Sequence, residues 1–143
     1  MIIERDDDIA RLLSNARTIA LVGASDKEDR ASNRVMKFLL AQGYTVWPVN
    51  PQMAGQQIHG QTVYAALADL PGKADLVDIF RNSEAAGPIT DEAIAAGAGA
   101  VWMQLEIINQ PAAERAAAAG LDVVMNRCPK IEIPRLGVAA ISG

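Results

Sequence analysis

The chain of 143 residues has the length of one domain, and its 50% hydrophobic and 21% charged residues are typical of a folded protein rather than a disordered one. A net charge of -4 argues against nucleic acid as a partner, because binding to a phosphate backbone requires a basic surface. One cysteine, Cys128, and one histidine, His59, exclude a disulfide framework and argue against a structural zinc site or other metal centre. The acidic N-terminus does not resemble a signal peptide, and no apolar run approaches the roughly 18 residues of a membrane span, so a cytoplasmic protein is expected.

Strand-like and helix-like segments alternate along the chain. Apolar residues at helical spacing after Asp6 predict a first helix, and short apolar runs that end in glycine or a turn predict buried strands. The expected strands are residues 18–23, 44–51, 74–80, 100–103 and 121–125, and the later helices are expected to begin near Ser32, Ser83 and Asn109.

Three segments depart from this alternation. Pro48 lies within the second strand and is expected to end its ladder, because proline donates no hydrogen bond. The expected irregular segments are a loop at 52–60, a helical turn at 64–68, and a surface tail from residue 128 that contains Pro129 and Pro134.

The order of these elements predicts the fold class. Strands that alternate with helices through short connections run parallel, and right-handed crossovers place the helices on both faces of the sheet. The sequence therefore predicts one α/β domain over residues 1–143, a Rossmann-like doubly wound sheet of about five parallel strands.

The first strand–helix junction is the expected ligand site, because ligands of such sheets bind at the carboxyl ends of the strands. Gly23 permits a tight turn, and the small Ala24 and Ser25 let backbone N–H groups approach a phosphate. Arg30 and Arg34 bracket the start of the following helix and could pair with phosphate oxygens. From these residues alone, a turn glycine with two solvated arginines is an equal alternative.

The end of the second strand disfavours NAD. The dinucleotide fingerprint requires three spaced glycines, but Gly23 is the single glycine before Gly43. It also requires an acidic residue after the second strand, and the sequence there is Pro48, Val49, Asn50 and Pro51. Asn50 could hydrogen-bond a ribose or an adenine edge, or the Asn-Pro pair could simply mark a turn.

Six segments resemble a known family. They are V-G-A-S at 22–25, R-A-S-N-R-V at 30–35, G-Y-T-V-W-P-V-N-P at 43–51, V-D-I-F-R at 77–81, V-W-M-Q-L at 101–105 and V-V-M-N-R-C-P-K-I-E at 123–132. In their order and spread along the chain they resemble the YccU-type CoA-binding domain proteins of bacteria, relatives of the CoA-binding domain of the succinyl-CoA synthetase α subunit.

The resemblance implies that coenzyme A is the ligand. It places Gly23, Ala24 and Ser25 at the pyrophosphate with Arg30 and Arg34 nearby, Pro48, Val49, Asn50 and Pro51 beside the adenosine, and Ile79, Phe80 and Arg81 along the pantetheine arm. Several positions depart from the pattern. Gln52 replaces a lysine of the synthetase relatives, and common residues of the family are also replaced at Ala31, Ala66, Glu106, Pro129 and Ile133, where Glu106 stands in place of a glycine.

No nucleophile beside a base is evident, so the sequence predicts non-catalytic binding of CoA or an acyl-CoA. Asp75, Asp78 and Asp91 are interpreted as capping or solvated carboxylates. Two alternatives stay open: an enzyme that acts on a nucleotide or acyl thioester, and a protein-interaction domain with a decayed nucleotide site, to which Gln52 and Glu106 point.

Cys128 and the two tryptophans carry two further hypotheses. If Cys128 is exposed, Arg127 and Lys130 would lower its pKa, and the thiol could form a mixed disulfide with CoA. A buried cysteine is the alternative. Exposed Trp47 or Trp102 could serve a homodimer contact, although aromatic residues in strands more often lie in the core.

Overall fold

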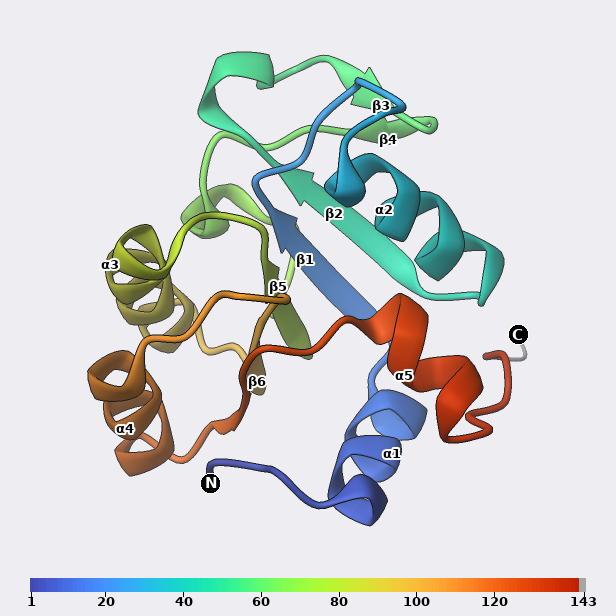
Figure 1. The fold of residues 1–143 in the computed structure, drawn as a ribbon. Coiled ribbons are helices and arrows are strands. Elements are labelled where there is room, and N and C mark those ends of the chain that lie inside the picture. Colours follow the sequence, from blue (N-terminus) through green and yellow to red (C-terminus); the bar gives the residue numbers. More distant parts are fainter. Residues whose placement is uncertain (142–143) are drawn as a thin grey trace.

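A computed structural model describes residues 1–141, and its centre is a five-stranded parallel sheet in the order β2-β1-β5-β6-β7 (Figure 1). The sheet strands are β1 (Thr18–Val22), β2 (Thr45–Val49), β5 (Leu76–Ile79), β6 (Ala100–Met103) and β7 (Asp122–Val124). The helices are α1 (Asp6–Asn15), α2 (Ala31–Ala41), α3 (Ser83–Ala95), α4 (Gln110–Ala118) and α5 (Pro129–Arg135). The predicted Rossmann-like α/β class is thus confirmed, and the strand order reverses between β1 and β5.

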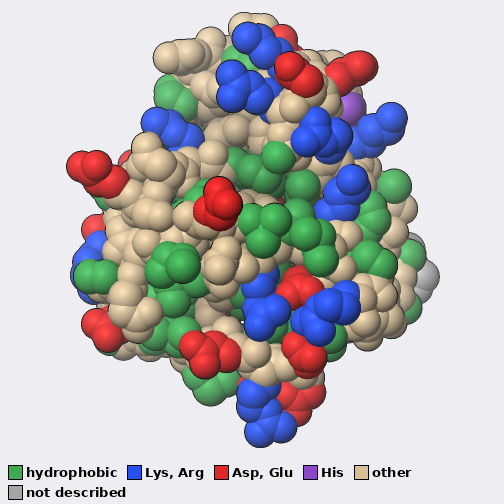
Figure 2. Space-filling view, in the orientation of Figure 1, with side chains coloured by type: hydrophobic (Ala, Val, Ile, Leu, Met, Phe, Trp, Pro, Cys, Tyr) green, Lys and Arg blue, Asp and Glu red, His purple; other side chains and the backbone are tan. Residues whose placement is uncertain are grey.

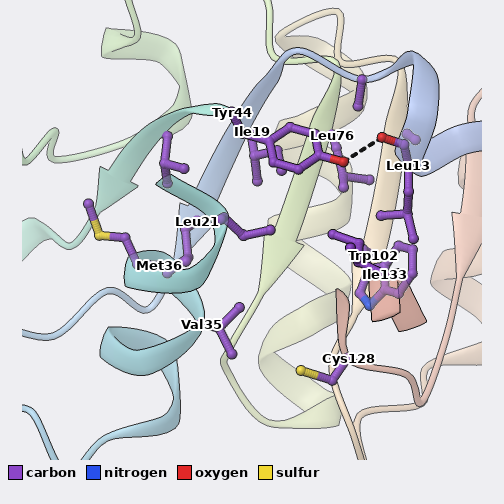
Figure 3. Packing of buried hydrophobic residues seen from close by; sticks show 14 of the residues in the cluster. Leu13, Ile19, Leu21, Val35, Met36, Tyr44, Leu76, Trp102, Cys128 and Ile133 are labelled. Atoms are coloured by element: carbon purple, nitrogen blue, oxygen red, sulfur yellow. Dashed lines mark hydrogen bonds between the residues drawn. The ribbon is translucent and has the colours of Figure 1, made fainter. Parts of the chain in front are cut away.

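Two hydrophobic clusters lie on opposite faces of the sheet. One contains residues of α1, α2 and α5, and the other contains residues of α3 and α4, as the two groups of helices in Figure 1 indicate. Figure 3 shows the first cluster, where the Tyr44 hydroxyl donates to the Leu13 carbonyl and Trp102 lies in the interior. The Trp102 indole N–H donates to the carbonyl of Arg127 at 2.7 Å, so Trp102 is a core residue and not a dimer contact.

Pro48 does not end the ladder of β2, contrary to the prediction. It pairs with Leu21 of β1, and β2 continues to Val49. Its carbonyl accepts the N–H of Tyr64 at 2.9 Å on the outer side of this edge strand. The N–H and C=O of one strand residue point to the same side, so the nitrogen of Pro48 also faces outward and costs the β1–β2 ladder no bond.

Short segments run along both outer strands of the sheet. Tyr64 forms a parallel bridge with Val49 of β2. At the other edge Ile2 bridges Val123 of β7, and the Ile3 N–H donates to the Val123 carbonyl at 2.8 Å.

The expected loop at 52–60 contains a hairpin. Strands β3 (Gln57–Ile58) and β4 (Gln61–Thr62) pair antiparallel around His59 and Gly60, which have φ of 48° and 79°. Two residues with positive φ form the type of turn that matches the twist of a hairpin. The expected helical turn is the 3-10 helix η2 (Leu67–Asp69), shifted toward the C-terminus from residues 64–68.

The tail predicted to be irregular forms helix α5. Pro129 is its first residue, a position at which an N–H would have no acceptor within the helix. Pro134 lies in the last turn. Helix α2 also begins earlier than predicted, because Arg30 and not Ser32 occupies its N-cap position. None of the helices between residues 1 and 141 has the length and apolarity needed to traverse a bilayer.

Candidate functional site

A cleft of about 780 Å³ opens at the carboxyl ends of β1, β2 and β5, where the strand order reverses. This is the position at which open parallel α/β sheets bind ligands. Figure 2 shows Lys and Arg side chains gathered in the upper part of this view, where α2 and the β3–β4 hairpin lie in Figure 1.

The structure brings eight of the twelve predicted site residues to this cleft. They are Gly23, Ser25, Arg30, Val49, Asn50, Pro51, Phe80 and Arg81. Ala24, Pro48 and Ile79 are buried and do not line it. Arg34 does not line it either, because its guanidinium donates to the carbonyls of Asp29 at 2.7 Å and Glu28 at 3.4 Å, and so braces the loop before α2.

Sequence reasoning missed seven lining residues. They are Val22, Asp26, Lys27, Ala31, Ser32, Gln52 and Met53. Lys27 had a signal, since it lies in the same loop as Arg30 and carries the same charge. Its backbone N–H donates to the Ser25 hydroxyl at 3.1 Å, which folds the loop over the end of β1.

Gly23 allows the first loop to pass against the third. Its φ is 92°, and a Cβ at this position would lie 3.2 Å from the carbonyl carbon, carbonyl oxygen and Cβ of Phe80. The Gly23 N–H also donates to the Val49 carbonyl at 3.0 Å. Gly23 therefore holds the loops after β1, β2 and β5 close enough to form one cleft.

The N-terminus of α2 provides the chemistry of the cleft. Arg30 makes no side-chain cap, and no acidic residue lies in the first turn. The N–H groups of Ala31 and Ser32 have no acceptor among the residues that the structure describes, and both residues line the cleft. Unpaired N–H groups at a helix N-terminus, beside exposed cations at Lys27, Arg30 and Arg81, form a binding site for an anion such as a phosphate.

The side chain of Asn50 joins two walls of the cleft. Its Nδ2 donates to the Ala24 carbonyl at 2.9 Å, and its Oδ1 accepts the Gln52 N–H at 2.9 Å. The Asn-Pro pair therefore both forms a turn and ties the end of β2 to the loop after β1.

His59 lies outside the cleft lining and fastens the hairpin to α2. Its Nε2 lies 3.0 Å from Asn33 Oδ1 and 3.2 Å from the Asn33 carbonyl. The Nδ2 of Asn33 in turn donates to the Ser25 carbonyl at 2.9 Å. The only histidine thus contributes, through Asn33, to the position of the loop after β1.

Cys128 is buried, and burial raises the pKa of its thiol, with a smaller contribution in the same direction from Asp78. The structure thus confirms the buried alternative, and the exposed thiol on which a lowered pKa depended is not present. A protonated thiol in the core is a poor nucleophile.

Asp78 was interpreted as a capping or solvated carboxylate, and this is wrong. It lies on β5 with no exposed surface, and Gln104 Nε2 donates to its two carboxylate oxygens at 2.9 and 3.2 Å. Burial raises the pKa of Asp78 to about 7, and the hydrogen bond from Gln104 offsets only part of that effect. Asp75 does cap, since it accepts the N–H groups of Arg17 and Thr18, and Asp91 pairs with Arg115 at the surface.

Replacing Gly23 with alanine is expected to impair both folding and the cleft. The positive φ and the contact with Phe80 together should lower the free energy of unfolding by about 1–3 kcal/mol. Gly120→Ala is a matched control, because Gly120 has a φ of 91° but nothing within 4 Å of its added Cβ. Urea unfolding of both variants measures the difference, and equal losses would show that the approach to Phe80 contributes nothing.

A parallel sheet that reverses its strand order beside an anion-binding cleft defines a Rossmann-like ligand-binding domain. Residues 17–134 match the family described as CoA binding domain. The chain belongs to this family, which confirms the resemblance found in its sequence.

Two similar proteins share most of their length with this chain, and a third, longer one matches it over about a quarter of its own length. It is 32% identical over 124 residues to the uncharacterized protein YneT of Bacillus subtilis, covering 87% of this chain and 90% of YneT. A hypothetical protein from Pyrococcus horikoshii is 41% identical with a TM-score of 0.88, covering 93% of this chain and 92% of that one. The dinucleotide forming acetyl-coenzyme A synthetase 1 of Ca. Korarchaeum cryptofilum is 26% identical with a TM-score of 0.67, covering 78% of this chain and 26% of the synthetase.

Proposed function

We propose that this chain binds coenzyme A or an acyl-CoA in the cleft at the carboxyl ends of β1, β2 and β5, and does not transform it. The observation that carries the proposal is the unpaired N-terminus of α2. The Ala31 and Ser32 N–H groups open on a cleft that Lys27, Arg30 and Arg81 make cationic. Family membership supports coenzyme A as the ligand, because every lining residue of the cleft lies within residues 17–134, which match the CoA binding domain.

The arrangement suits the charges of coenzyme A. Its diphosphate would be bound by the N–H groups of Ala31 and Ser32 with Arg30, and the small Gly23 allows backbone to approach it. Coenzyme A also carries a 3′-phosphate, a second anionic group with which Lys27 or Arg81 could pair. NAD lacks that group, and no acidic side chain follows β2 to bind its ribose.

The side chains of the cleft support binding without chemistry. The hydroxyl of Ser25 accepts the N–H of Lys27, and no hydrogen bond within residues 1–141 joins a lining hydroxyl to a carboxylate or an imidazole. A nucleophile activated by a base lies within hydrogen-bond reach of it, an arrangement for which these bonds give no support. The acetyl-coenzyme A synthetase to which the chain is similar is about three times as long as this chain, so a role of the domain within larger acyl-CoA enzymes is consistent with binding alone.

Thermal unfolding with added ligands tests the proposal. A ligand that binds only the folded protein stabilises it by about 2.7 kcal/mol at a hundredfold excess over Kd. CoA is expected to raise the Tm clearly, 3′-dephospho-CoA less, and NAD not at all. No shift with CoA at millimolar concentration would overturn the proposal, and turnover of acetyl-CoA would favour the enzyme instead.

Arg30→Gln is expected to weaken CoA binding at least tenfold. A hydrogen bond to a charged group contributes about 1.5–3 kcal/mol, and Arg30 is exposed, so its replacement should leave the fold intact. Lys73→Gln is the control. Lys73 is also exposed, and its replacement removes the same charge before β5, at the opposite end of the sheet from the cleft. Calorimetric titration gives both Kd values, and equal losses in the two variants would indicate a nonspecific charge effect.

A further inference from the structure

Two walls of the cleft come from different parts of the chain. One is the loop after β1 with the first turn of α2, and the other is the segment after β2, which continues into the β3–β4 hairpin. Gln52 and Met53 of that segment line the cleft, and the Gln56 N–H donates to the Met53 carbonyl at 3.0 Å. Figure 1 shows the hairpin beside the start of α2. The spacing of the two walls therefore depends on how the hairpin is held against α2.

Two side chains join these walls. At the end of β2, the Asn50 Nδ2 donates to the Ala24 carbonyl at 2.9 Å. In the hairpin turn, the Nε2 of His59 lies 3.0 Å from Asn33 Oδ1 and 3.2 Å from the Asn33 carbonyl. Asn33 is 4% exposed, and its Nδ2 donates at 2.9 Å to the carbonyl of Ser25, which lines the cleft. Hydrogen bonds therefore connect the hairpin turn, through α2, to the loop after β1.

The direction of each hydrogen bond in this series is fixed. The Ser25 carbonyl can only accept, so the Asn33 amide turns its Nδ2 toward Ser25 and its Oδ1 toward His59. The Asn33 carbonyl can also only accept, so the Nε2 of His59 carries a hydrogen and donates it. The imidazolium and the neutral ring in this tautomer both have that hydrogen. Position 59 therefore requires an N–H donor at Nε2, and neither a base nor a charge.

The backbone at His59 imposes a second, separate requirement. Its φ is 48°, in the left-handed region that asparagine, aspartate and histidine adopt more readily than other residues with a side chain. The side chain is exposed, so it contributes little to the core. Asparagine would suit this backbone at least as well as histidine, so the donor and the backbone conformation can be tested apart.

We infer that His59 is a positioning residue for ligand binding, which acts through Asn33 on the wall formed by the loop after β1 and the start of α2. This inference rests on the proposed binding of coenzyme A in the cleft. The wall contains Ser25 and the N–H groups of Ala31 and Ser32, which are proposed to bind the diphosphate. A hydrogen bond makes a modest net contribution, so loss of the His59 donor should raise the Kd of CoA about fivefold.

Two substitutions of His59 test the inference. The Nε2 of glutamine is as many bonds from Cα as the Nε2 of histidine and also donates, whereas the amide of asparagine ends one bond short. In calorimetric titration, His59→Gln should keep the CoA Kd of the parent, and His59→Asn should raise it about fivefold. A role of the backbone alone predicts the opposite order, because asparagine adopts a positive φ more readily than glutamine. Urea unfolding without ligand verifies that both variants fold.

A double variant tests whether His59 acts through Asn33. In an Asn33→Ala background, His59→Asn should lose most of its effect on the Kd of CoA, because the side-chain acceptor is already absent.

The contrary results are distinct. An unchanged Kd in His59→Asn, equal losses in the two His59 variants, or an undiminished effect in the Asn33→Ala background would overturn the positioning role and leave CoA binding in place. Absence of CoA binding by the parent would instead overturn the proposed function.

Discussion

Asp78→Asn is expected to be about 4 kcal/mol more stable than the parent at about pH 8 and equally stable at about pH 4. The parent buries an ionisable group that loses its proton as the pH rises through about 7, whereas asparagine stays neutral throughout. Asparagine also keeps an oxygen that can accept the Gln104 Nε2 hydrogen bond.

The sign follows from the pKa values of the two states. The pKa of Asp78 is about 7 in the folded protein and 3.8 as the ordinary value, because burial penalises the charged form. Between these values the folded state holds the proton and the unfolded state does not. The contribution of protonated Asp78 to the free energy of unfolding of the parent is fully present below about pH 4. It is lost as the pH rises to about 7 and does not change further above that pH.

Urea unfolding of parent and variant across this pH range measures the difference. Asp69→Asn is the control, since Asp69 is exposed and its replacement should leave the pH dependence of the parent unchanged. A constant difference between Asp78→Asn and the parent at every pH would mean that Asp78 is not a buried proton-binding group.

Glu132→Gln is expected to lower the free energy of unfolding by about 1.5–3 kcal/mol, because it removes the buried charge that binds both Arg127 and Arg135 through charged hydrogen bonds. Glu132 is 3% exposed, and its carboxylate accepts from Arg127 and Arg135 at 2.6 Å each. Burial opposes ionisation of Glu132, but the hydrogen bonds from Arg135 and Arg127 outweigh it and keep the pKa below its ordinary value. Arg135 also pairs with Asp6 of α1 at 2.8 Å, so the network joins α5 to α1.

Asp91→Asn is the matched control for Glu132→Gln, as it also converts a carboxylate to an amide. Asp91 pairs with Arg115 at 2.9 Å, but both side chains are about half exposed, so a loss below about 1 kcal/mol is expected. Chemical denaturation compares the two variants. Similar losses would indicate that burial adds nothing to the Glu132 network.

The sheet could be predicted from the sequence because each of its strands is a short apolar run between turn residues. The errors arose where tertiary position overrides a local rule. Pro48 is tolerated because β2 is an edge strand, and a sequence does not state which strand lies at the edge. Pro129 and Pro134 suggested an irregular tail. Pro129 is the first residue of α5, where helices tolerate proline, whereas Pro134 lies inside this short helix at the cost of one helical hydrogen bond. The β3–β4 hairpin was also missed. Its signal is the turn at His59 and Gly60, which is flanked by the buried residues Ile58 and Val63.

The candidate site could be located from the order of the strands, since the glycine turn after β1 and the ends of β2 and β5 meet at one edge. The orientation of single side chains could not be predicted. Arg34 was expected to face a phosphate, but it bonds to the carbonyls of the preceding loop. The burial of Asp78 was missed because β5 is buried on both faces. In such a strand polar and apolar residues do not alternate, so the sequence pattern does not reveal whether a carboxylate is buried or exposed.

The bridges of Tyr64 to β2 and of Ile2 to β7 bear on how this protein behaves at high concentration. An open sheet is prone to aggregate through its outermost strands, whose unpaired amides can template the strands of another molecule. Here Tyr64 covers part of the free edge of β2, and Ile2 covers part of the free edge of β7. Pairing of these edges with the strands of another copy is thereby disfavoured.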